Sequence, residues 1–289
     1  MTQETGFLRH FQACNARDME KFAPFYVGTR RLGWIKKKIA ALLPGEMDFF
    51  VPHKDGLALA RQLDNFDARS KALAAAAAFV SEKRERKLRK EMYPVLEKWG
   101  DQPLAQLDRA AVPWFGIKGY GVHVNGFVRK KGGIHLWIGE RAKDREISPG
   151  KLDNLIGGGQ PIGLTLEENL AKEAKEEADL GSEYVKLMKP AGTINYMLEK
   201  QGGLRNDGLF VYDLELPESV IPRNTDGEVE KFDLLPVAEV AALVRDTDRF
   251  KFNCNVVIID FLTRHDLLPK DKEHADVQAA LKKARGEAG

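Results

Sequence analysis

The chain has 289 residues, with 45 basic and 43 acidic side chains and a formal net charge of +2. This near-balance argues against a general nucleic-acid-binding protein, which would carry a strong basic excess. The two cysteines, Cys14 and Cys254, form no CxxC pair, which argues against a disulfide framework and against a cysteine zinc site.

No stretch approaches the roughly 20 apolar residues that span a bilayer, and the first residues, MTQETGFLRHFQACN, contain no apolar signal region. We therefore expect a soluble, cytoplasmic protein that binds neither membranes nor nucleic acid. The sequence leaves open whether the protein is a monomer or a homodimer. A chain of this length buries roughly three quarters of the surface of its unfolded form, so a large core needs no disulfides.

The first 110 residues mix strand and helix patterns. The sequences FAPFYV (22–27) and RRLGWI (30–35) predict a hairpin, with Gly28 and Thr29 in the turn. The stretch 70–93 is rich in Ala, Leu, Lys, Arg and Glu, which predicts one long helix. Glutamates interleave its basic run from Lys83 to Lys90, which favours a solvated helix face over a phosphate-seeking patch.

Strand patterns dominate after residue 110. Strand-like runs occupy 121–129, 134–141, 191–198 and 209–216, with a helix between the second and the third. Helical spacing of apolar residues follows at 236–246 and 255–268, and the tail predicts a last helix. We place a domain boundary near residue 110, so that an α/β domain of residues 111–289 follows a smaller α+β domain of residues 1–110.

The most informative stretch is LIGGGQPIGLTLEENLAKEAKEEADL, residues 155–180. Thr165 and Glu168 form the T-x-x-E pattern of a capping box, which predicts that a helix begins at Thr165. Four glycines between residues 157 and 163 precede this helix. Glycines let the backbone turn sharply and approach a ligand closely, so the stretch predicts a ligand-binding loop followed by a helix.

Three glutamates, Glu173, Glu176 and Glu177, share one face of the predicted helix. At roughly 100° per residue, Glu173 and Glu177 point toward the apolar stripe that contains Leu166 and Leu170. Carboxylates that lean inward need a partner, and clustered oxygen ligands suit Mg²⁺ or Mn²⁺. The alternative is a solvated acidic helix, but the glycine loop and the inward direction favour a metal site.

The same residues resemble the Nudix box, whose family form is G-x5-E-x7-R-E-U-x-E-E-x-G-U, where U is a bulky aliphatic residue. The alignment begins at Gly158 and matches the three glutamates that bind metal in the family to the three glutamates of this helix. Four positions depart from the family form. They are Leu164 in place of the first glutamate, Lys172 in place of arginine, Ala174 in place of a bulky aliphatic residue and Asp179 in place of glycine.

The flanking sequence resembles one branch of the Nudix superfamily, which carries an extra N-terminal domain of unknown function. The segments that carry this resemblance are YGVHVNGFV, LWIGERAKDREISPGKLDNLIGGG, GTINY, FVYDLELP, DGEVEKFDLL and FKFNCNVVIIDFLTRHDLL. The branch includes the Nudix portion fused to thiamine pyrophosphokinase in some fungi, and a degenerate box is usual in it. The resemblance implies a Nudix α/β/α sandwich with a mixed sheet. Because an otherwise small catalytic domain carries the extra domain, we expect that domain to cover one side of the substrate pocket.

The resemblance implies metal-dependent hydrolysis of a diphosphate, with the three box glutamates as ligands of Mg²⁺ or Mn²⁺. It also implies that Lys172 orients a glutamate through an ion pair, as the arginine does in the family. A later acidic residue often completes such a site or acts as a base. Glu228 and Glu230 are the candidates, and their alternation predicts a strand with both on one face.

The branch implies a small-molecule substrate, namely thiamine diphosphate or its oxidised oxy and oxo analogues, which is converted to the monophosphate with release of phosphate. A second hypothesis keeps the chemistry but takes a nucleoside diphosphate derivative such as ADP-ribose or NADH as substrate. A third is a ligand-binding module without catalysis, which Leu164 favours and the intact glutamates oppose.

Several side chains in the strand region are candidates for binding a flat heteroaromatic cation and its phosphates. The aromatic candidates are Trp114, Phe115, Tyr120, Trp137 and Tyr196. The polar candidates are His123 and Asn125, and the basic candidates for the phosphates are Arg141, Lys143 and Lys151. For each aromatic or polar candidate the ordinary alternative is a core residue, and for each basic candidate it is an exposed surface charge.

Overall fold

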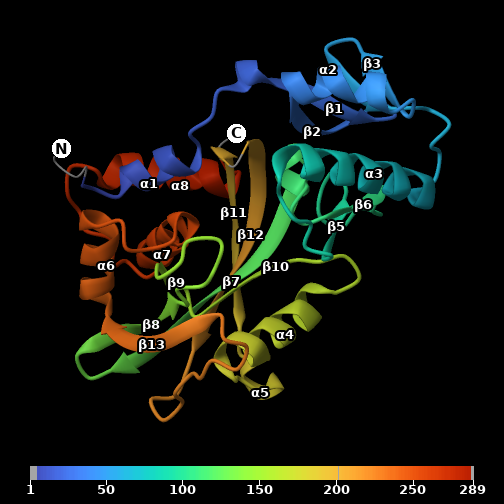
Figure 1. Ribbon diagram of the computed structural model, residues 1–289. Coiled ribbons are helices and arrows are strands. Elements are labelled where there is room, and N and C mark those ends of the chain that lie inside the picture. The colour runs from blue at the N-terminus through green and yellow to red at the C-terminus, as the bar shows by residue number, and fades with distance from the viewer. Residues whose placement is uncertain (1–4, 201, 288–289) are drawn as a thin grey trace.

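The computed structural model describes residues 5–200 and 202–287, and its described part contains three β-sheets with helices packed around them (Figure 1). Two of the sheets belong to the N-terminal region. The four-stranded sheet has the order β2-β1-β4-β3 and pairs β1 (Phe22–Val27), β2 (Arg30–Lys36), β3 (Phe50–His53) and β4 (Gly56–Leu59). The two-stranded sheet pairs β5 (Met92–Val95) with β6 (Ala105–Asp108).

Helices α2 (Lys37–Glu46) and α3 (Phe66–Arg84) accompany these sheets, and their apolar residues share one core with the strands. The predicted hairpin is confirmed: β1 and β2 pair antiparallel around a turn in which Gly28 has φ +62°. A positive φ of this size is unfavourable for residues with a side chain, which explains the glycine at the turn.

The helix predicted over 70–93 is correct only in its first part. Asn65 caps α3 by accepting the backbone N–H of Ala68, and the helix ends at Arg84, where Glu85 turns into the left-handed region with φ 52°. Beyond it the carboxylate of Asp108 accepts the backbone N–H groups of Arg89 and Lys90. The basic run is therefore divided: Lys83 and Arg84 belong to the last turn of α3, while the residues after Arg84 lie outside the helix, where a tertiary contact outweighs helix propensity.

The large sheet has seven strands and lies in the C-terminal region. Its main order is β11-β12-β7-β8-β13, while β10 pairs with β7 and β9 with β8. The strands are β7 (Lys118–Lys130), β8 (Gly133–Arg141), β9 (Leu152–Asp153), β10 (Ile156–Gly159), β11 (Lys189–Lys200), β12 (Gly203–Glu215) and β13 (Val229–Pro236). Because β12 runs parallel to β7 while the other pairs are antiparallel, the sheet is mixed, as predicted.

Helices cover both faces of the large sheet (Figure 1). One face packs against α1 (Leu8–Cys14), α6 (Val237–Asp246), α7 (Phe252–Arg264) and α8 (His274–Arg285), and the other against α4 (Leu166–Ala178) and α5 (Ser182–Val185). This arrangement is the predicted α/β/α sandwich. No helix in the described ranges has both the length and the apolar character required to cross a membrane.

The N-terminal region and the large sheet meet at a tight backbone junction. Short 3-10 helices lie at Met19–Lys21 and Val112–Trp114, and the second of them leads into Phe115. The carbonyl of Phe115 accepts the backbone N–H of Trp34 at 2.8 Å. The Phe115 ring is fully buried and its centroid lies 5.4 Å from that of Phe25. This ring therefore belongs to the core of the N-terminal region.

We predict that Phe115→Ala lowers the free energy of unfolding by about 3–5 kcal/mol, because it leaves a cavity in a closed core. Urea titration followed by tryptophan fluorescence measures this change. Leu42→Ala is the matched control: Leu42 is 38% exposed, so its truncation is expected to cost no more than about 0.5 kcal/mol. Equal losses for the two variants would contradict the assignment of Phe115 to the core.

Candidate active site

Helix α4 begins where the sequence predicts. Thr165 accepts the backbone N–H of Glu168 at 3.2 Å, and Glu168 accepts the backbone N–H of Thr165 at 2.8 Å, so both halves of the capping box are formed. Leu170 and Ala174 are buried against the large sheet. The small side chain of Ala174 occupies a position that is fully closed to solvent, which ties the helix closely to the sheet.

Glu177 lies on the inward face of α4, as predicted. It is only 6% exposed, and one carboxylate oxygen accepts the backbone N–H of Gly157 at 2.7 Å. Burial, reinforced by the neighbouring charge of Glu173, raises the pKa of Glu177 to about 8. A carboxylate in this position is strained as an anion and would be stabilised by a cation.

Glu173 lies against the glycine strand β10. A Cβ atom at Gly158 would stand 2.2 Å from the carboxyl carbon of Glu173, so a side chain at position 158 would displace this carboxylate. Burial raises the pKa of Glu173, while Lys172 opposes this shift. Lys172 Nζ lies 3.2 Å from Glu173 and 2.8 Å from the half-exposed Glu176. The lysine thus joins these two glutamates as a point charge, without the planar geometry of an arginine.

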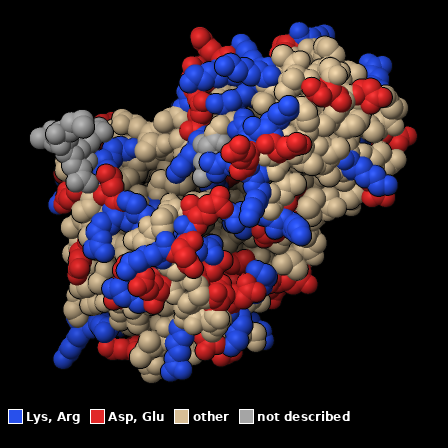
Figure 2. Space-filling view, in the orientation of Figure 1, with Lys and Arg blue, Asp and Glu red and all other residues tan. Residues whose placement is uncertain are grey.

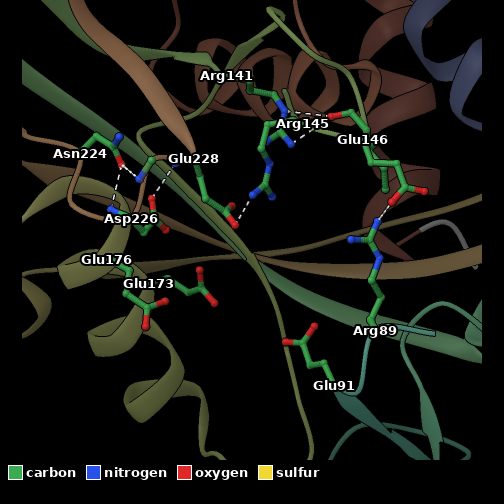
Figure 3. A network of polar contacts seen from close by, with 12 residues as sticks. Arg89, Glu91, Arg141, Arg145, Glu146, Glu173, Glu176, Asn224, Asp226 and Glu228 are labelled. Carbon is green, nitrogen blue, oxygen red and sulfur yellow. Dashed lines mark hydrogen bonds and ion pairs between the residues drawn. The ribbon is translucent and has the colours of Figure 1, made fainter. Parts of the chain in front are cut away.

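The two later glutamates are separated by the structure. Glu228 lines the cavity in front of α4 and pairs with Arg145 (Figure 3), whereas Glu230 lies outside the cavity and pairs with Lys143 at 3.6 Å. The expectation of one strand with both glutamates on a shared face was wrong because β13 begins at Val229, after Glu228, and its pairing with β8 skips Glu230. A bulge of this kind breaks the two-residue alternation of side chains.

The donor set of this corner fits a hard divalent cation. The carboxylates of Glu173, Glu176, Glu177, Asp226 and Glu228 all line the cavity, and burial raises the pKa of Asp226 as well. Oxygen donors without sulfur or imidazole suit Mg²⁺ or Mn²⁺. The bare position at Gly158 lets the Glu173 carboxylate lie against β10, and the burial that raises the pKa of Glu177 means that a bound cation would stabilise its anionic form.

The cavity has a volume of about 700 Å³ and lies between the two regions of the chain. In Figure 2 acidic and basic side chains crowd together over the middle of the molecule, where the two regions meet. Residues from the N-terminal region that line it include Arg89, Glu91, Tyr93 and Arg109. These positions match the expectation that the N-terminal domain covers one side of the pocket.

Some predicted binding residues line this cavity. They are Trp114, Tyr120, His123, Arg141 and Tyr196. Their surroundings limit what they can do. His123 Nδ1 lies 2.9 Å from the side-chain oxygen of Asn154, and burial lowers the pKa of His123 to about 4, so its ring is neutral. Arg141 is buried and binds Asp153 at 2.8 Å.

Other predicted binding residues do not line the cavity, and these expectations are corrected. Phe115 is in the N-terminal core, and Asn125 is 1% exposed and donates to Asp213 at 3.1 Å. Trp137 packs in the core under α4, while Lys151 donates to the carbonyl of Asp248 and Lys143 pairs with Glu230. Alternation along a strand predicts a face, but it does not reveal how far along the sheet the cavity extends.

A second group of potential metal ligands lies beneath the cavity. His123, Asp153 and Cys254 are buried with ligand atoms within 4.8 Å of one another. However, Asp153 binds Arg141 at 2.8 Å and Lys251 at 3.0 Å. Burial works to raise the pKa of Asp153, but these cations and His123 lower it below its usual range. The charge of Asp153 is therefore already neutralised by side chains.

Sequence reasoning missed the far end of the cavity. There Asp207 on β12 accepts the hydroxyl of Tyr196 at 2.6 Å and the side chain of Arg205 at 3.0 Å. Both bonds reach Oδ2, while Oδ1 lies 3.0 Å from the position that a Cβ would occupy at Gly119. Charged residues at alternate positions of an otherwise apolar strand were the available signal for this site.

Comparison with known proteins places this architecture in a family. Residues 6–119 match a family described as a domain of unknown function (DUF4743). The chain is 39% identical to Nudix hydrolase 24, chloroplastic, of Arabidopsis thaliana over 285 aligned residues. The alignment covers 96% of this chain and 78% of the relative. The chain is 37% identical to Nudix hydrolase 20, chloroplastic, of the same plant, with the same coverage.

This chain belongs to the Nudix hydrolase family. It is thus an enzyme that acts on a diphosphate substrate, and Nudix hydrolases generally use a divalent metal ion. Among solved structures, the chain is similar to DR0079 of Deinococcus radiodurans, with a TM-score of 0.44 and 21% identity over 58% of this chain and 97% of that one.

The raised pKa of Glu177 predicts pH-dependent metal binding by this Nudix hydrolase. Below about pH 8 the buried carboxyl carries a proton in the metal-free protein, and this proton must leave before the oxygen binds a cation. We expect the Mg²⁺ affinity to rise from about pH 6 to about pH 8, with proton release visible by calorimetry in buffers of different ionisation enthalpy.

The carboxyl group of Glu177 also determines how the stability of the metal-free protein changes with pH. The free energy of unfolding of the metal-free protein should fall as the pH rises from the ordinary carboxyl pKa of 4.5 to about 8, because in this range the folded state holds a proton on Glu177 that the unfolded state has lost. Glu177→Gln should remove both effects. Glu167→Gln, at an exposed position of the same helix, is the matched control. Unchanged proton release in Glu177→Gln would contradict the assignment.

Proposed function

We propose that this Nudix hydrolase cleaves the diphosphate of thiamine diphosphate and of its oxidised oxy and oxo analogues, giving the monophosphate and phosphate. The flanking sequence, which resembles the thiamine-related branch, suggests this substrate. The observation that carries the proposal is the carboxylate of Asp207, which lines the same cavity as the predicted metal ligands and pairs with Gly119 on β7, whereas Gly158, beside Glu173, pairs with Val122 further along that strand. A cationic heterocycle with an exposed amino group needs such an acceptor.

The floor of the cavity supports a flat ring. Gly119 and Gly121 on β7 both line it, and a Cβ at Gly121 would stand 2.7 Å from the carbonyl oxygen of Gly158. The bare Gly121 therefore lets β10 lie close to β7, and the bare Gly119 leaves room beside Oδ1 of Asp207. Tyr196 and Tyr93 line the same end of the cavity. Aromatic rings beside a carboxylate favour a flat cation.

The chemistry would be divided between the two ends of the cavity. A divalent ion held by Glu173, Glu176 and Glu177 would neutralise charge on the phosphate oxygens and help to generate a nucleophilic water. Glu228, which lines the cavity, would accept a proton at this end, and its partner Arg145 would turn to a phosphate oxygen. Asp207 and the tyrosines would hold the organic part, so that the diphosphate lies against α4.

A substrate panel tests the proposal. We expect kcat/KM for thiamine diphosphate and its oxy and oxo analogues to exceed the values for ADP-ribose and NADH by at least about tenfold, since ADP-ribose and NADH lack the cationic heterocycle that Asp207 would hold. Phosphate release and product mass give the measurement. A preference for ADP-ribose or NADH would overturn the choice of substrate and leave the diphosphate chemistry in place.

Glu228 and Glu230 form a matched pair for testing the proton acceptor. We expect Glu228→Gln to lower kcat by about a hundredfold, because it removes a proton acceptor at the reacting end of the cavity. Glu230→Gln should leave kcat within about twofold, since exposed ion pairs contribute little. Both are measured with thiamine diphosphate and with the best substrate of the panel. Equal effects of the two substitutions would exclude the role assigned to Glu228.

A further inference from the structure

We propose that the N-terminal domain is the phosphate-binding half of the active site, and that Arg89 and Arg109 bind diphosphate oxygens opposite the carboxylates of α4. The inference deepens the proposed function: it rests on a diphosphate substrate but not on thiamine as its organic part. It gives a role to a region that matches a domain of unknown function.

The charges that line the cavity are divided unequally between the two regions. The N-terminal wall has four basic residues, Arg86, Lys87, Arg89 and Arg109, against the single acidic residue Glu91. The wall that follows residue 110 has five basic and eight acidic residues. The wall with excess carboxylate attracts a divalent cation but repels a diphosphate. The basic wall opposite supplies the charge that would hold the anion against the metal.

The basic wall is preorganised by a buried carboxylate. Asp108 is 6% exposed and accepts the backbone N–H groups of Arg89 at 3.0 Å, Lys90 at 2.7 Å and Ala110 at 2.9 Å. These bonds hold Lys90 in the left-handed region with φ 60°. The backbone N–H of Arg109 also donates to the carbonyl of Glu91 at 2.8 Å. The chain segments that carry both arginines are thereby joined.

The same wall is attached to the glycine loop of the active site. The backbone N–H of Ile162 donates to the carbonyl of Met92 at 2.9 Å. A Cβ at Gly159 would stand 1.5 Å from the hydroxyl oxygen of Tyr93, so the N-terminal domain reaches the residue that follows Gly158. Since Gly158 lies against Glu173, the basic wall is held in fixed register with the carboxylates of α4.

Both arginines bind carboxylates that line the same cavity. Arg89 pairs with Glu146, and Arg109 Nη1 binds Glu91 at 2.7 Å. Figure 3 shows Arg89 and Arg145 on one side of an open space, with Glu173 and Glu176 on another. Guanidinium groups bind carboxylate and phosphate oxygens with the same planar set of N–H donors. The Arg89–Glu146 pair is largely exposed, so a phosphate can replace the carboxylate at low cost.

Binding of methylenediphosphonate, a diphosphate that cannot be hydrolysed, tests the proposal in the full chain with saturating Mg²⁺. We expect Arg89→Ala and Arg109→Ala each to weaken its binding by about tenfold in calorimetry, as for the loss of a charged hydrogen bond. Arg109→Lys keeps the charge and should recover part of the loss. Arg30→Ala is the control, because Arg30 is in the same domain, pairs with Glu97 at 3.8 Å and lies outside the cavity.

Glu146→Gln provides a test with the opposite sign. This substitution removes the carboxylate that competes with the ligand for Arg89, so it should tighten methylenediphosphonate binding. If the Arg89–Glu146 pair only stabilised the fold, both Arg89→Ala and Glu146→Gln would weaken binding. Unchanged affinity in the two arginine variants, or weaker binding in Glu146→Gln, would overturn the proposal. Since methylenediphosphonate carries no heterocycle, these results are independent of the substrate panel that tests thiamine diphosphate.

Discussion

The arrangement of the active site depends on a carboxylate that is buried before any metal binds. Glu177 is held inside the protein by one backbone N–H, with the charge of Glu173 beside it. Packing of Leu170 and Ala174 on the sheet fixes the rotation of α4, so that Glu177 faces the cavity from a buried position. Without a cation the buried carboxyl group favours its protonated form, and a divalent cation is the partner that stabilises the carboxylate.

Three consecutive glycines of β10 lie between the carboxyl groups of α4 and the N-terminal domain. The N–H of Gly157 binds Glu177, the bare α-carbon of Gly158 makes room for Glu173, and that of Gly159 makes room for Tyr93 of the N-terminal domain. A side chain at either of the last two positions would separate the parts that meet here. The glycines thus act less through backbone flexibility than through the space that they leave on both sides of β10.

Local patterns predicted much of this fold because local interactions decide it. The capping box at Thr165, the hairpin at Gly28 and the inward direction of Glu177 follow from spacing alone, and the structure contains each of them. The failures arise where a distant residue intervenes. Glu228 precedes β13 while Glu230 is skipped in the pairing of that strand, and the carboxylate of Asp108 binds the backbone of residues 89 and 90 outside a helix. Neither contact leaves a signal in the local sequence.

The hydrogen bonds between Asp108 and the backbone of the basic segment explain how the extra domain contributes to the proposed active site. A single buried carboxylate both keeps the basic segment out of helix α3 and presents its arginines to the cavity. Without that wall, the α/β/α domain would offer a diphosphate a surface with more carboxylates than basic groups. An ion held by α4 neutralises part of this excess, but oxygens that point away from the ion still need donors. Donors that Asp108 holds in fixed positions can meet those oxygens without reorganisation, which is the condition for strong electrostatic stabilisation of a transferring phosphoryl group.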